Sequence, residues 1–535
     1  MIRISDTTLR DGAQAEGISF SQEDKIQIIR GLDDLGLSWI EAGNPSSNPV
    51  DASLFQALES LPPLRHAKLS AFGSTCRPGV PAEADEALVR LSEVKADSKT
   101  IFGKSSVSHV RLVLRCTPGE NLRMIGDSIS YLRSRGDSVW FDAEHFFDGY
   151  AEDPSYALET LKSAEAAGAE RIILCDTNGG SLPETIKVGV IAARNAVRIP
   201  LGIHCHNDCG LAAANSLAAL DSGCDLVQGT IGGIGERCGN ADLCTLIPLI
   251  SIKKNRPCLP EGHLMRLTHI YRVLSEIMNI APNENAPFVG YSAFAHKGGM
   301  HIDAILKDHC TYEQVDPELV GNQRRFLVSD QSGRAGIYAK LGRLFPDLNR
   351  DSREIAGVLK KLKEMESEGY TYENADGSFE LLAMETLGRR PGFFHVLDYH
   401  VLSQQGNGGL DARAYLKIEV NGQVGINAAE GDGPVNALDL ALRKTLSFFY
   451  PSIRKMRLQD FKVRVLNSRG TASKVRVSIE STDGIHLWKT VGVHSNIILA
   501  SLYALVDSVD YMLTRYVSKD EIQAAAGISS SGEAE

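Results

Sequence analysis

Short apolar segments alternate with longer amphipathic stretches along the first half of the chain. The apolar segments are rich in β-branched and aromatic residues, and most gaps between them are long enough for a helix. This pattern predicts strands at 2–6, 37–42, 67–72, 98–102, 138–143, 171–175, 201–205 and 226–230. Eight strands that alternate with helices predict an α/β fold with a closed (β/α)8 barrel, a TIM barrel. An open doubly wound sheet is the alternative, but no G-x-G-x-x-G follows the first strand.

The first predicted helix carries start and stop signals. Ser21 and Asp24 have the spacing of a capping box, and Gly36 stands where a helix would end. Between them, apolar residues recur at helical spacing, at positions 26, 29, 32 and 35. The segment 21–36 therefore predicts an amphipathic helix between the first two strands.

The pattern changes twice after the predicted barrel, which we assign to residues 1–265. Residues 266–390 are helical and charged, which predicts helical linker subdomains. Residues 391–520 predict a separate C-terminal α+β domain, with strands at 414–420, 462–466 and 474–480 and helices around 434–449 and 496–515. The small and polar segment 521–535 predicts a disordered tail. No internal repeat is apparent.

Composition and charge narrow the class of protein. The 535 residues are 43% hydrophobic and 23% charged, as in globular proteins with more than one domain. A net charge of −11 does not support a nucleic-acid partner. No apolar run approaches the ~20 residues of a membrane span, and no signal peptide is apparent, so we expect a cytoplasmic protein without a membrane partner. The ten cysteines are expected to be reduced thiols.

The most specific local pattern is HCHND at 204–208, on the seventh predicted strand. Side chains alternate along a strand, so His204 and His206 project to the same side, and the carboxyl ends of barrel strands carry the active site. Two imidazoles at this spacing can share one metal ion. For an isolated His-x-His, a pair of ordinary polar residues is the alternative reading.

Two loops add polar groups at the same end of the predicted barrel. The loop DTTLRDGAQ at 6–14 offers a carboxylate in Asp11 and a planar guanidinium in Arg10, although it also fits a capped loop with a surface ion pair. The loop GGIGERCGN at 232–240 contains four glycines and ends in Asn240, an additional oxygen ligand. With both histidines, Asp11 and Asn240 predict a mixed N/O site for Mn²⁺, Mg²⁺ or Zn²⁺.

A thiolate zinc site is the rival reading of this region. Its ligands would be four nearby cysteines, Cys205, Cys209, Cys238 and Cys244. No C-x-x-C pair occurs among them, and Cys205 should point away from its two histidine neighbours. Buried structural cysteines are the favoured interpretation.

The blocks DTTLRDG, HCHND and GERCGN, in this order, resemble the acyl-CoA-dependent 2-hydroxy-acid synthases, the family of isopropylmalate, homocitrate and citramalate synthases. The wider group includes hydroxymethylglutaryl-CoA lyase and the transferase domain of pyruvate carboxylase. Further blocks are similar to the citramalate branch: IFGK at 101–104, FDAEHFFDGY at 141–150, CDTNGG at 175–180, HKGGMH at 296–301 and DPELVGN at 316–322. Near the other end, AEGDGP at 429–434 and TVGV at 490–493 are similar to a regulatory domain of these synthases.

The resemblance implies an acyltransferase that condenses acetyl-CoA with pyruvate and hydrolyses the thioester to (R)-citramalate and CoA, in a route to isoleucine. A divalent metal would chelate the 2-oxo acid, and Arg10 would stand where the oxyanion forms. Gln14 and Thr177 would join Arg10 in binding substrate. Glu144, His301 and Tyr312 are the implied catalytic residues for proton transfer. His301 lies outside the predicted barrel, and the resemblance implies that its region serves the partner's site in a homodimer.

Alternatives to this reading remain. A synthase for a bulkier 2-oxo acid, such as 2-isopropylmalate or homocitrate synthase, would differ mainly in pocket volume. A carbon–carbon lyase like hydroxymethylglutaryl-CoA lyase belongs to a different class and lacks the long C-terminal domain. A non-catalytic amino-acid sensor would require loss of a metal ligand. For the C-terminal domain the resemblance implies an end-product effector, which we expect to be isoleucine.

Overall fold

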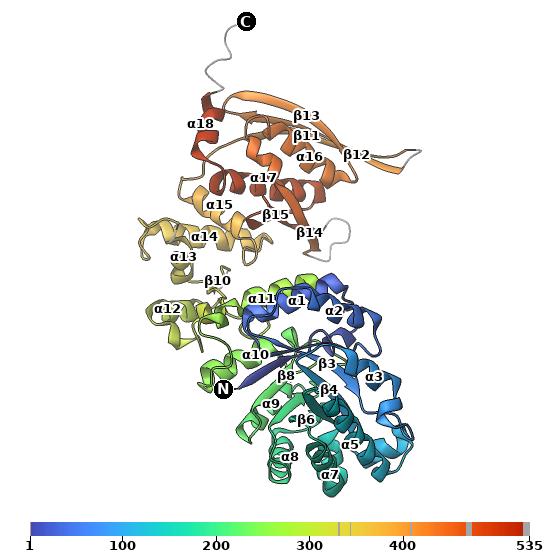
Figure 1. Ribbon diagram of the computed structural model, residues 1–535. Coiled ribbons are helices and arrows are strands. Elements are labelled where there is room, and N and C mark those ends of the chain that lie inside the picture. The colour runs from blue at the N-terminus through green and yellow to red at the C-terminus, as the bar shows by residue number, and fades with distance from the viewer. Residues whose placement is uncertain (1, 330–331, 343, 407–408, 467–472, 528–535) are drawn as a thin grey trace. The chain divides into compact units, whose positions relative to one another are not determined.

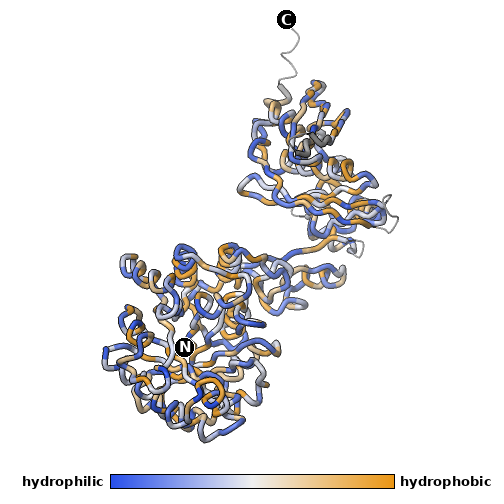
Figure 2. Tube along the Cα trace, turned by 90° about the vertical axis from the view of Figure 1, so that its right-hand side faces the viewer, coloured by the Kyte–Doolittle hydropathy of each residue, from blue (hydrophilic) through white to orange (hydrophobic). Residues whose placement is uncertain are grey.

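The chain forms two compact units in a computed structural model that describes residues 2–329, 332–342, 344–406, 409–466 and 473–527 (Figure 1). Unit 1 comprises Met1–Phe294 with Val315–Arg324, and unit 2 comprises Ala295–Gln314 with Arg325–Glu535. Along the traced chain, hydrophobic and hydrophilic positions alternate in short runs through both units (Figure 2). Each unit has hydrophobic core clusters of buried residues, and each is described separately below.

Unit 1 is a closed barrel in which each strand pairs in parallel with its neighbours in chain order, and β1 pairs with β8. Its strands are β1 (Arg3–Asp6), β2 (Trp39–Gly43), β3 (Lys68–Ser74), β4 (Ser98–Lys104), β5 (Val139–Glu144), β6 (Arg171–Asp176), β7 (Leu201–Cys205) and β8 (Leu226–Gly229). All eight predicted strands are therefore confirmed, and the open-sheet alternative is excluded. This is the TIM-barrel architecture.

Helices surround the barrel strands (Figure 1). They are α1 (Gln22–Leu35), α2 (Pro49–Glu59), α3 (Glu86–Glu93), α4 (Val107–His109), α5 (Pro118–Ser134), α6 (Phe146–Glu152), α7 (Pro154–Ala166), α8 (Pro183–Ala196), α9 (Ala212–Asp221), α10 (Leu243–Pro248) and α11 (Leu267–Ile277). The capping box of α1 is confirmed, because the Ser21 hydroxyl accepts the Asp24 N–H at 3.1 Å and the Asp24 carboxylate accepts the Ser21 N–H at 2.8 Å. Gly36 ends α1 in the left-handed conformation, with φ 88°.

The barrel interior changes character along its axis. A small apolar cluster, separate from the core beneath the helices, contains Trp39, Trp140, Ile173, Cys175 and Leu226. Side chains alternate along a strand, so residues two positions further along β2, β5 and β8 project into the same interior. These are polar and fully buried: Glu41, Asp142 and Gln228. The polar level lies toward the carboxyl ends of the strands and leads to the candidate site.

Unit 2 begins with a helical part. It contains α12 (Gly299–Lys307), α13 (Arg334–Leu341), α14 (Arg353–Ser367) and α15 (Asp376–Thr386), with a two-residue parallel pair, β9 (Ala295–His296) and β10 (Arg325–Phe326). Apolar residues of α13, α14 and α15 share one core cluster. The helical character predicted after the barrel therefore holds, while the predicted domain limits stay predictions.

The rest of unit 2 confirms the predicted α+β class and shows one order of elements twice. The first half is β11 (His395–Gly406), β12 (Gly409–Val420), β13 (Gln423–Gly431) and α16 (Pro434–Leu446). The second half is β14 (Arg457–Val465), β15 (Val475–Thr482), β16 (Leu487–His494) and α17 (Ile497–Arg515). Each half is an antiparallel three-stranded meander followed by a helix, and this repeat was not apparent in the sequence.

One helix of the described chain, α17, is long and apolar enough to cross a membrane by length and composition alone. It packs against β15 and β16, and 61% of its apolar window is buried inside the structure, as in a core helix. A further helix, α18 (Lys519–Gly527), covers the beginning of the segment predicted to be a disordered tail. Residues 528–535 lie outside the described residues.

Candidate active site

A cavity of about 190 Å³ opens at the carboxyl ends of the barrel strands, where the active sites of such barrels lie. Residues that follow or end β1, β3, β4, β5, β6 and β7, with the loop after β8, contribute its lining. The lining residues are Arg10, Asp11, Gln14, Phe72, Phe102, Asp142, Glu144, Cys175, Thr177, His204, His206 and Glu236. Seven of the ten residues predicted for the site therefore meet in one cavity: Arg10, Asp11, Gln14, Glu144, Thr177, His204 and His206.

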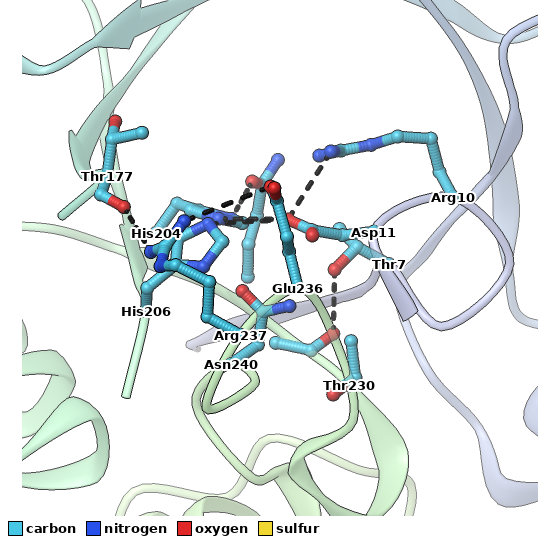
Figure 3. A network of polar contacts seen from close by, with 12 residues as sticks. Thr7, Arg10, Asp11, Thr177, His204, His206, Thr230, Glu236, Arg237 and Asn240 are labelled. Atoms are coloured by element: carbon cyan, nitrogen blue, oxygen red, sulfur yellow. Dashed lines mark hydrogen bonds and ion pairs between the residues drawn. The ribbon is translucent and has the colours of Figure 1, made fainter. Parts of the chain in front are cut away.

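Asp11, His204 and His206 converge on one point, with Arg10 beside Asp11 (Figure 3). Their ligand atoms all lie within 4.8 Å of one another. Asp11 Oδ2 is 3.2 Å from His204 Nε2 and 3.7 Å from His206 Nε2. All three side chains are buried, so an ion here would be largely shielded from water. The geometry fits a metal centre with one carboxylate and two imidazole ligands.

Asn240, the fourth predicted ligand, is held next to this group. Its backbone pairs with that of His206 in an isolated antiparallel bridge, and the whole residue is 2% exposed. Its amide nitrogen donates to the carbonyl of Ile234 at 3.3 Å, whereas its buried Oδ1 has no hydrogen-bond partner within the described residues. The same holds for the buried Oδ1 of Asp11, again within the described part of the chain. Unpaired buried oxygens are costly unless something else contacts them, and a bound cation would do so.

The charges around the cluster favour ligation. Burial alone would raise the pKa of Asp11, but the Arg10 charge and the His204 hydrogen bond hold it well below its usual range. Burial and the neighbouring His204 lower the pKa of His206 to about 4, so this ring is neutral at pH 7. For His204, the hydrogen bond and charge of Asp11 raise the pKa in spite of burial. An ionised carboxylate and a neutral imidazole are the forms that bind metals, so Asp11 and His206 are already in the ligating form, whereas His204 would release its Nε2 proton on metal binding.

Arg10 is fixed on three sides. Its Nε donates to Glu41 Oε1 at 2.6 Å, and its Nη1 lies 3.3 Å from Asp11 Oδ2. Its guanidinium carbon stands 4.0 Å from the centre of the Phe72 ring, a cation–π contact. Although burial acts to lower the pKa of Arg10, the charges of Glu41 and Asp11 raise it above its ordinary value. The alternative of a surface ion pair is excluded, because the Arg10 side chain is only 14% exposed.

A buried lysine holds the loop that carries Arg10 and Asp11. Lys25 Nζ, on α1, donates to the carbonyl of Leu9 at 2.9 Å and contacts Asp51 Oδ1 at 2.5 Å. The other oxygen of Asp51 accepts the backbone N–H of Asn44, which follows β2. The pair thus ties the loop after β1 to the loop after β2, immediately next to the candidate ligands.

Glu144 and Thr177 occupy neighbouring strand ends. Glu144 forms an ion pair with Lys104 of β4, so its carboxylate has a lysine partner. The Thr177 hydroxyl accepts the backbone N–H of His145 at 2.8 Å. His145 adopts a positive φ of 58°, and this turn lets the chain leave β5 directly after Glu144. Both predicted residues therefore reach the cavity, and Gln14 lines it from the loop after β1.

His301 and Tyr312, the remaining predicted catalytic residues, belong to unit 2 and are described within it. Their rings stack with centroids 4.1 Å apart and an interplanar angle of 25°. Both side chains are exposed in unit 2, and Tyr312 is 49% exposed. The structure brings these two residues together, while the lining of the barrel cavity comes from unit 1 alone.

The structure adds residues that line the cavity or contact its lining and that the sequence analysis did not select. Glu41 and Asp142 lie inside the barrel, and burial with the nearby charge of Glu41 raises the pKa of Asp142 to about 8. Charged residues within otherwise apolar strands are a signal that could have identified both. Phe72 and Phe102 stack across the cavity lining, with ring centroids 5.6 Å apart. Glu236 belongs to the glycine-rich loop that was selected only for Asn240.

The thiolate zinc site is not formed. The ten cysteines are free thiols, and of the four candidate ligands Cys205 and Cys244 are buried in the main core while Cys209 and Cys238 are exposed. Among the described residues, the second group with metal-ligand spacing is an exposed run in unit 2, Asp308, His309 and Cys310. The buried barrel cluster is therefore the candidate centre.

Comparison with known proteins agrees with this architecture along the chain. The HMGL-like family matches residues 1–274, a homocitrate synthase post-HMGL domain-like family matches residues 288–370, and the LeuA allosteric (dimerisation) domain matches residues 373–513. The (R)-citramalate synthase of Geobacter sulfurreducens is 47% identical over 518 residues, which cover 96% of this chain and 98% of the relative. That of Synechocystis sp. is 47% identical over 522 residues, covering 95% of each chain.

The chain is also similar, at lower identity, to a 2-isopropylmalate synthase and to a solved HMG-CoA lyase structure. The 2-isopropylmalate synthase of Methanocaldococcus jannaschii is 29% identical over 96% of this chain and 95% of the relative. Among solved structures, the HMG-CoA lyase of Bacillus subtilis has a TM-score of 0.46 at 20% identity, covering 53% of this chain and 96% of that one. The chain therefore belongs to the HMGL-like family and, within it, to the group of the (R)-citramalate synthases.

Proposed function

We propose that the chain is an (R)-citramalate synthase, which joins acetyl-CoA to pyruvate and hydrolyses the thioester to release citramalate and CoA. The observation that carries this proposal is the cavity that brings Arg10, Glu144 and Thr177 together with the Asp11–His204–His206 cluster. Similarity to several (R)-citramalate synthases over nearly the whole chain, at 45–47% identity, supports the choice of substrates.

Asp11, His204, His206 and Asn240 would hold a divalent metal ion, Mn²⁺, Mg²⁺ or Zn²⁺. When bound, such an ion supplies Lewis-acid polarisation of the 2-oxo group and offers positions for a chelating substrate. Arg10 would place its remaining N–H groups where negative charge develops on the carbonyl oxygen of pyruvate. Thr177 and Gln14 would orient the pyruvate carboxylate from neighbouring strand ends.

Proton transfer is the second requirement. A base takes a proton from the acetyl methyl group, the new carbon–carbon bond forms at the carbonyl carbon of pyruvate, and water then cleaves the thioester to free CoA. Glu144 is our candidate within the barrel cavity, where Lys104 holds its carboxylate. His301 and Tyr312 are proposed as further catalytic residues on the strength of the family resemblance and of their stacking.

The aromatic lining favours a small 2-oxo acid. Phe72 and Phe102 stack in the lining of a cavity of about 190 Å³, and Phe72 also contacts Arg10. One or two added methylenes on the substrate change transition-state binding by about 1–3 kcal/mol in a hydrophobic pocket. Pyruvate is therefore the proposed substrate, ahead of the bulkier acids of 2-isopropylmalate and homocitrate synthases.

The test is to incubate the purified protein with acetyl-CoA, Mn²⁺ and a panel of 2-oxo acids and to follow the free CoA thiol. We expect release with pyruvate and a preference for it over 2-oxoisovalerate. No release with any acid would refute a synthase, and a preference for 2-oxoisovalerate would favour the isopropylmalate alternative. Citramalyl-CoA cleavage without condensation would favour a carbon–carbon lyase.

We further propose a cytoplasmic homodimer regulated by isoleucine through residues 391–520. The LeuA allosteric (dimerisation) match to residues 373–513 supports both the dimer and the effector class. Isoleucine should lower the synthase rate and raise the melting temperature of the full chain, since a ligand that binds the folded state stabilises it. No effect of isoleucine on either quantity would refute this part of the proposal.

The dimer can be tested together with His301. If His301 acts in the barrel of the partner subunit, His204→Ala and His301→Ala proteins should each be inactive as pure dimers. After subunit exchange, a mixed dimer would contain one site with both substitutions and one with neither, so activity should return in part. Mixtures that exchange subunits and stay inactive would contradict a shared site.

A further inference from the structure

Gln228 is a buried polar residue of the barrel interior that the proposed chemistry does not use. It is 1% exposed and lies on β8, in register with His204 of β7 and Ser5 of β1. Its Oε1 is 3.0 Å from His204 Nδ1, and its amide nitrogen has no hydrogen-bond partner in the described part of the chain. A primary amide so deep in a barrel therefore has one specific contact, and that contact is to a candidate metal ligand.

The two ring nitrogens of His204 face different groups. Nε2 faces Asp11 Oδ2 at 3.2 Å, on the side of the candidate centre, and Nδ1 faces the Gln228 amide oxygen. An amide oxygen only accepts hydrogen bonds, so in this orientation the ring carries its hydrogen on Nδ1. A metal ion that binds Nε2 would displace the hydrogen that Nε2 otherwise donates to Asp11, while Nδ1 keeps its hydrogen on Gln228.

His206 provides an internal contrast. It belongs to the same candidate cluster, yet its buried Nδ1 has no hydrogen-bond partner among the residues that the structure describes. Only one of the two candidate imidazole ligands is therefore oriented by a second residue. Metal-binding histidines commonly donate their other N–H to a carboxylate, carbonyl or water, and loss of that partner weakens metal binding.

We propose that Gln228 is a positioning residue of the metal centre: its amide oxygen holds His204 in the tautomer and ring orientation that present Nε2 to the ion. Because the amide is neutral, it fixes the ring without adding a further acidic group to an interior that already contains Glu41 and Asp142. The inference rests on the proposed metal centre and concerns its assembly. It makes no assumption about the 2-oxo acid that the enzyme uses.

Three substitutions test the role in the full-length protein, with Co²⁺ alone as the probe. Gln228→Met keeps a similar side-chain length but removes the acceptor, and Gln228→Glu restores an acceptor. Ser70→Ala is the matched control, because the Ser70 hydroxyl bonds to Thr100 at 2.7 Å inside the same barrel and Ser70 is not among the described residues that line the cavity. Co²⁺ affinity is measured by calorimetry, and the visible absorption of bound Co²⁺ reports its ligand geometry.

We expect Gln228→Met to weaken Co²⁺ binding by about 10- to 100-fold and to change the Co²⁺ spectrum, as loss of such orienting partners does. Gln228→Glu should bind at least as tightly as the unsubstituted protein and keep its spectrum, and Ser70→Ala should change neither. A Gln228→Met protein that binds Co²⁺ with unchanged affinity would overturn the proposal. A Gln228→Glu protein whose Co²⁺ affinity falls tenfold or more would also overturn it. If the Gln228→Met protein does not fold, the Co²⁺ affinity of the Gln228→Glu protein alone decides the question.

A failure of the positioning role of Gln228 can be distinguished from a failure of the proposed metal centre. His204→Ala and the unsubstituted protein are compared in the same titration. Equal Co²⁺ binding by these two would overturn the metal centre and with it the role of Gln228. Loss of binding in His204→Ala, together with full binding in Gln228→Met, would retain the centre and overturn only the positioning role.

Discussion

Two arginines, one in each unit, stand between a pair of buried or half-buried carboxylates. In unit 1, the Arg10 cluster consists of Arg10, Asp11 and Glu41. In unit 2, the Arg390 cluster consists of Arg390, Asp507 and Asp510, with ion-pair distances of 3.1 and 2.7 Å. Each cluster combines one arginine with two carboxylates, yet we assign catalysis to the Arg10 cluster and a structural role to the Arg390 cluster.

The difference lies in the groups around each cluster. Asp11 also faces His204 and His206, so its surroundings are rich in cationic and metal-binding groups and its pKa is held well below the usual range. Asp507 instead has burial acting against its ionised form and shares one guanidinium with Asp510, and its pKa is raised to about 6. A buried arginine among carboxylates is therefore no evidence of catalysis by itself. The imidazoles of His204 and His206 beside Asp11 are the feature that supports a catalytic role for the Arg10 cluster.

The Arg390 cluster connects segments distant in sequence. Its arginine follows α15, and both carboxylates belong to α17. Asp507 also accepts the Ser378 hydroxyl of α15 at 2.7 Å, and the Ser378 oxygen accepts the backbone N–H of Val491 in β16 at 3.0 Å. These bonds join two helices and a strand within unit 2, which is why loss of the arginine should affect stability rather than turnover.

The largest effect should come from Asp11→Asn, which keeps the side-chain shape but removes the negative ligand. Several kcal/mol of transition-state stabilisation would be lost, so the synthase rate should fall by about 1000-fold or more. The protein should remain folded because no core packing is altered, although its melting temperature in EDTA should fall because the substitution removes the charge that pairs with Arg10 and His204. Initial rates and thermal melts check both outcomes. Activity close to that of the unsubstituted protein would remove the catalytic assignment of the Arg10 cluster.

Arg390→Met should give the opposite result. It leaves Asp507 and Asp510 without their cation, and we expect unit 2 to lose about 2 kcal/mol of stability. Urea denaturation measures this loss, while the initial rate of folded protein without isoleucine should stay within about twofold.

The matched control for Arg390→Met is Arg413→Met in the same unit. Arg413 pairs with Glu430 at 2.9 Å, but both side chains are more than half exposed. Such exposed pairs contribute about 0–1 kcal/mol, so the control should be nearly neutral. Equal losses in the two variants would mean that the Arg390 cluster is no more structural than a surface ion pair.

The barrel and its candidate metal ligands are the parts of the molecule that could be predicted from the sequence. All eight barrel strands were predictable, because each carries a short apolar run and the gaps fit helices. The candidate metal ligands were predictable too, because the period of a strand places His204 and His206 on one side. Both inferences use local patterns, which the sequence displays directly.

What the sequence did not reveal depends on contacts between distant segments. Glu41 and Gln228 become meaningful only when the barrel closes and places them beside Arg10 and His204. The two β-β-β-α halves were missed because only one strand of the first half and two of the second were apparent. β13 (QVGINAAEG) contains residues of low strand propensity, and β11 and β16 were not recognised as strands. Likewise, Arg390 and Asp507 are 117 residues apart along the chain, and neither has a local motif.

The smallest expected effect is a pH dependence that belongs to unit 2. In the folded state the pKa of Asp507 is raised to about 6 from an ordinary value of 3.8, through burial and the nearby charge of Asp510, against the opposing charge of Arg390 and the Ser378 hydrogen bond. The folded state therefore binds this proton more tightly, and the stability so gained is present below pH 3.8 and lost as pH rises through about 6.

Between pH 5 and 7 the loss should be about 1 kcal/mol, since the Asp507 side chain is 23% exposed and solvent reduces the effect. Asp507→Asn removes the titrating proton but keeps an oxygen for the Ser378 hydroxyl. Urea denaturation of both proteins at pH 5, 6 and 7 should show a difference in unfolding free energy that shifts in favour of the asparagine variant as pH rises. A difference that stays constant with pH would show that Asp507 is ionised throughout this range, and the two arginine clusters would then be electrostatically alike.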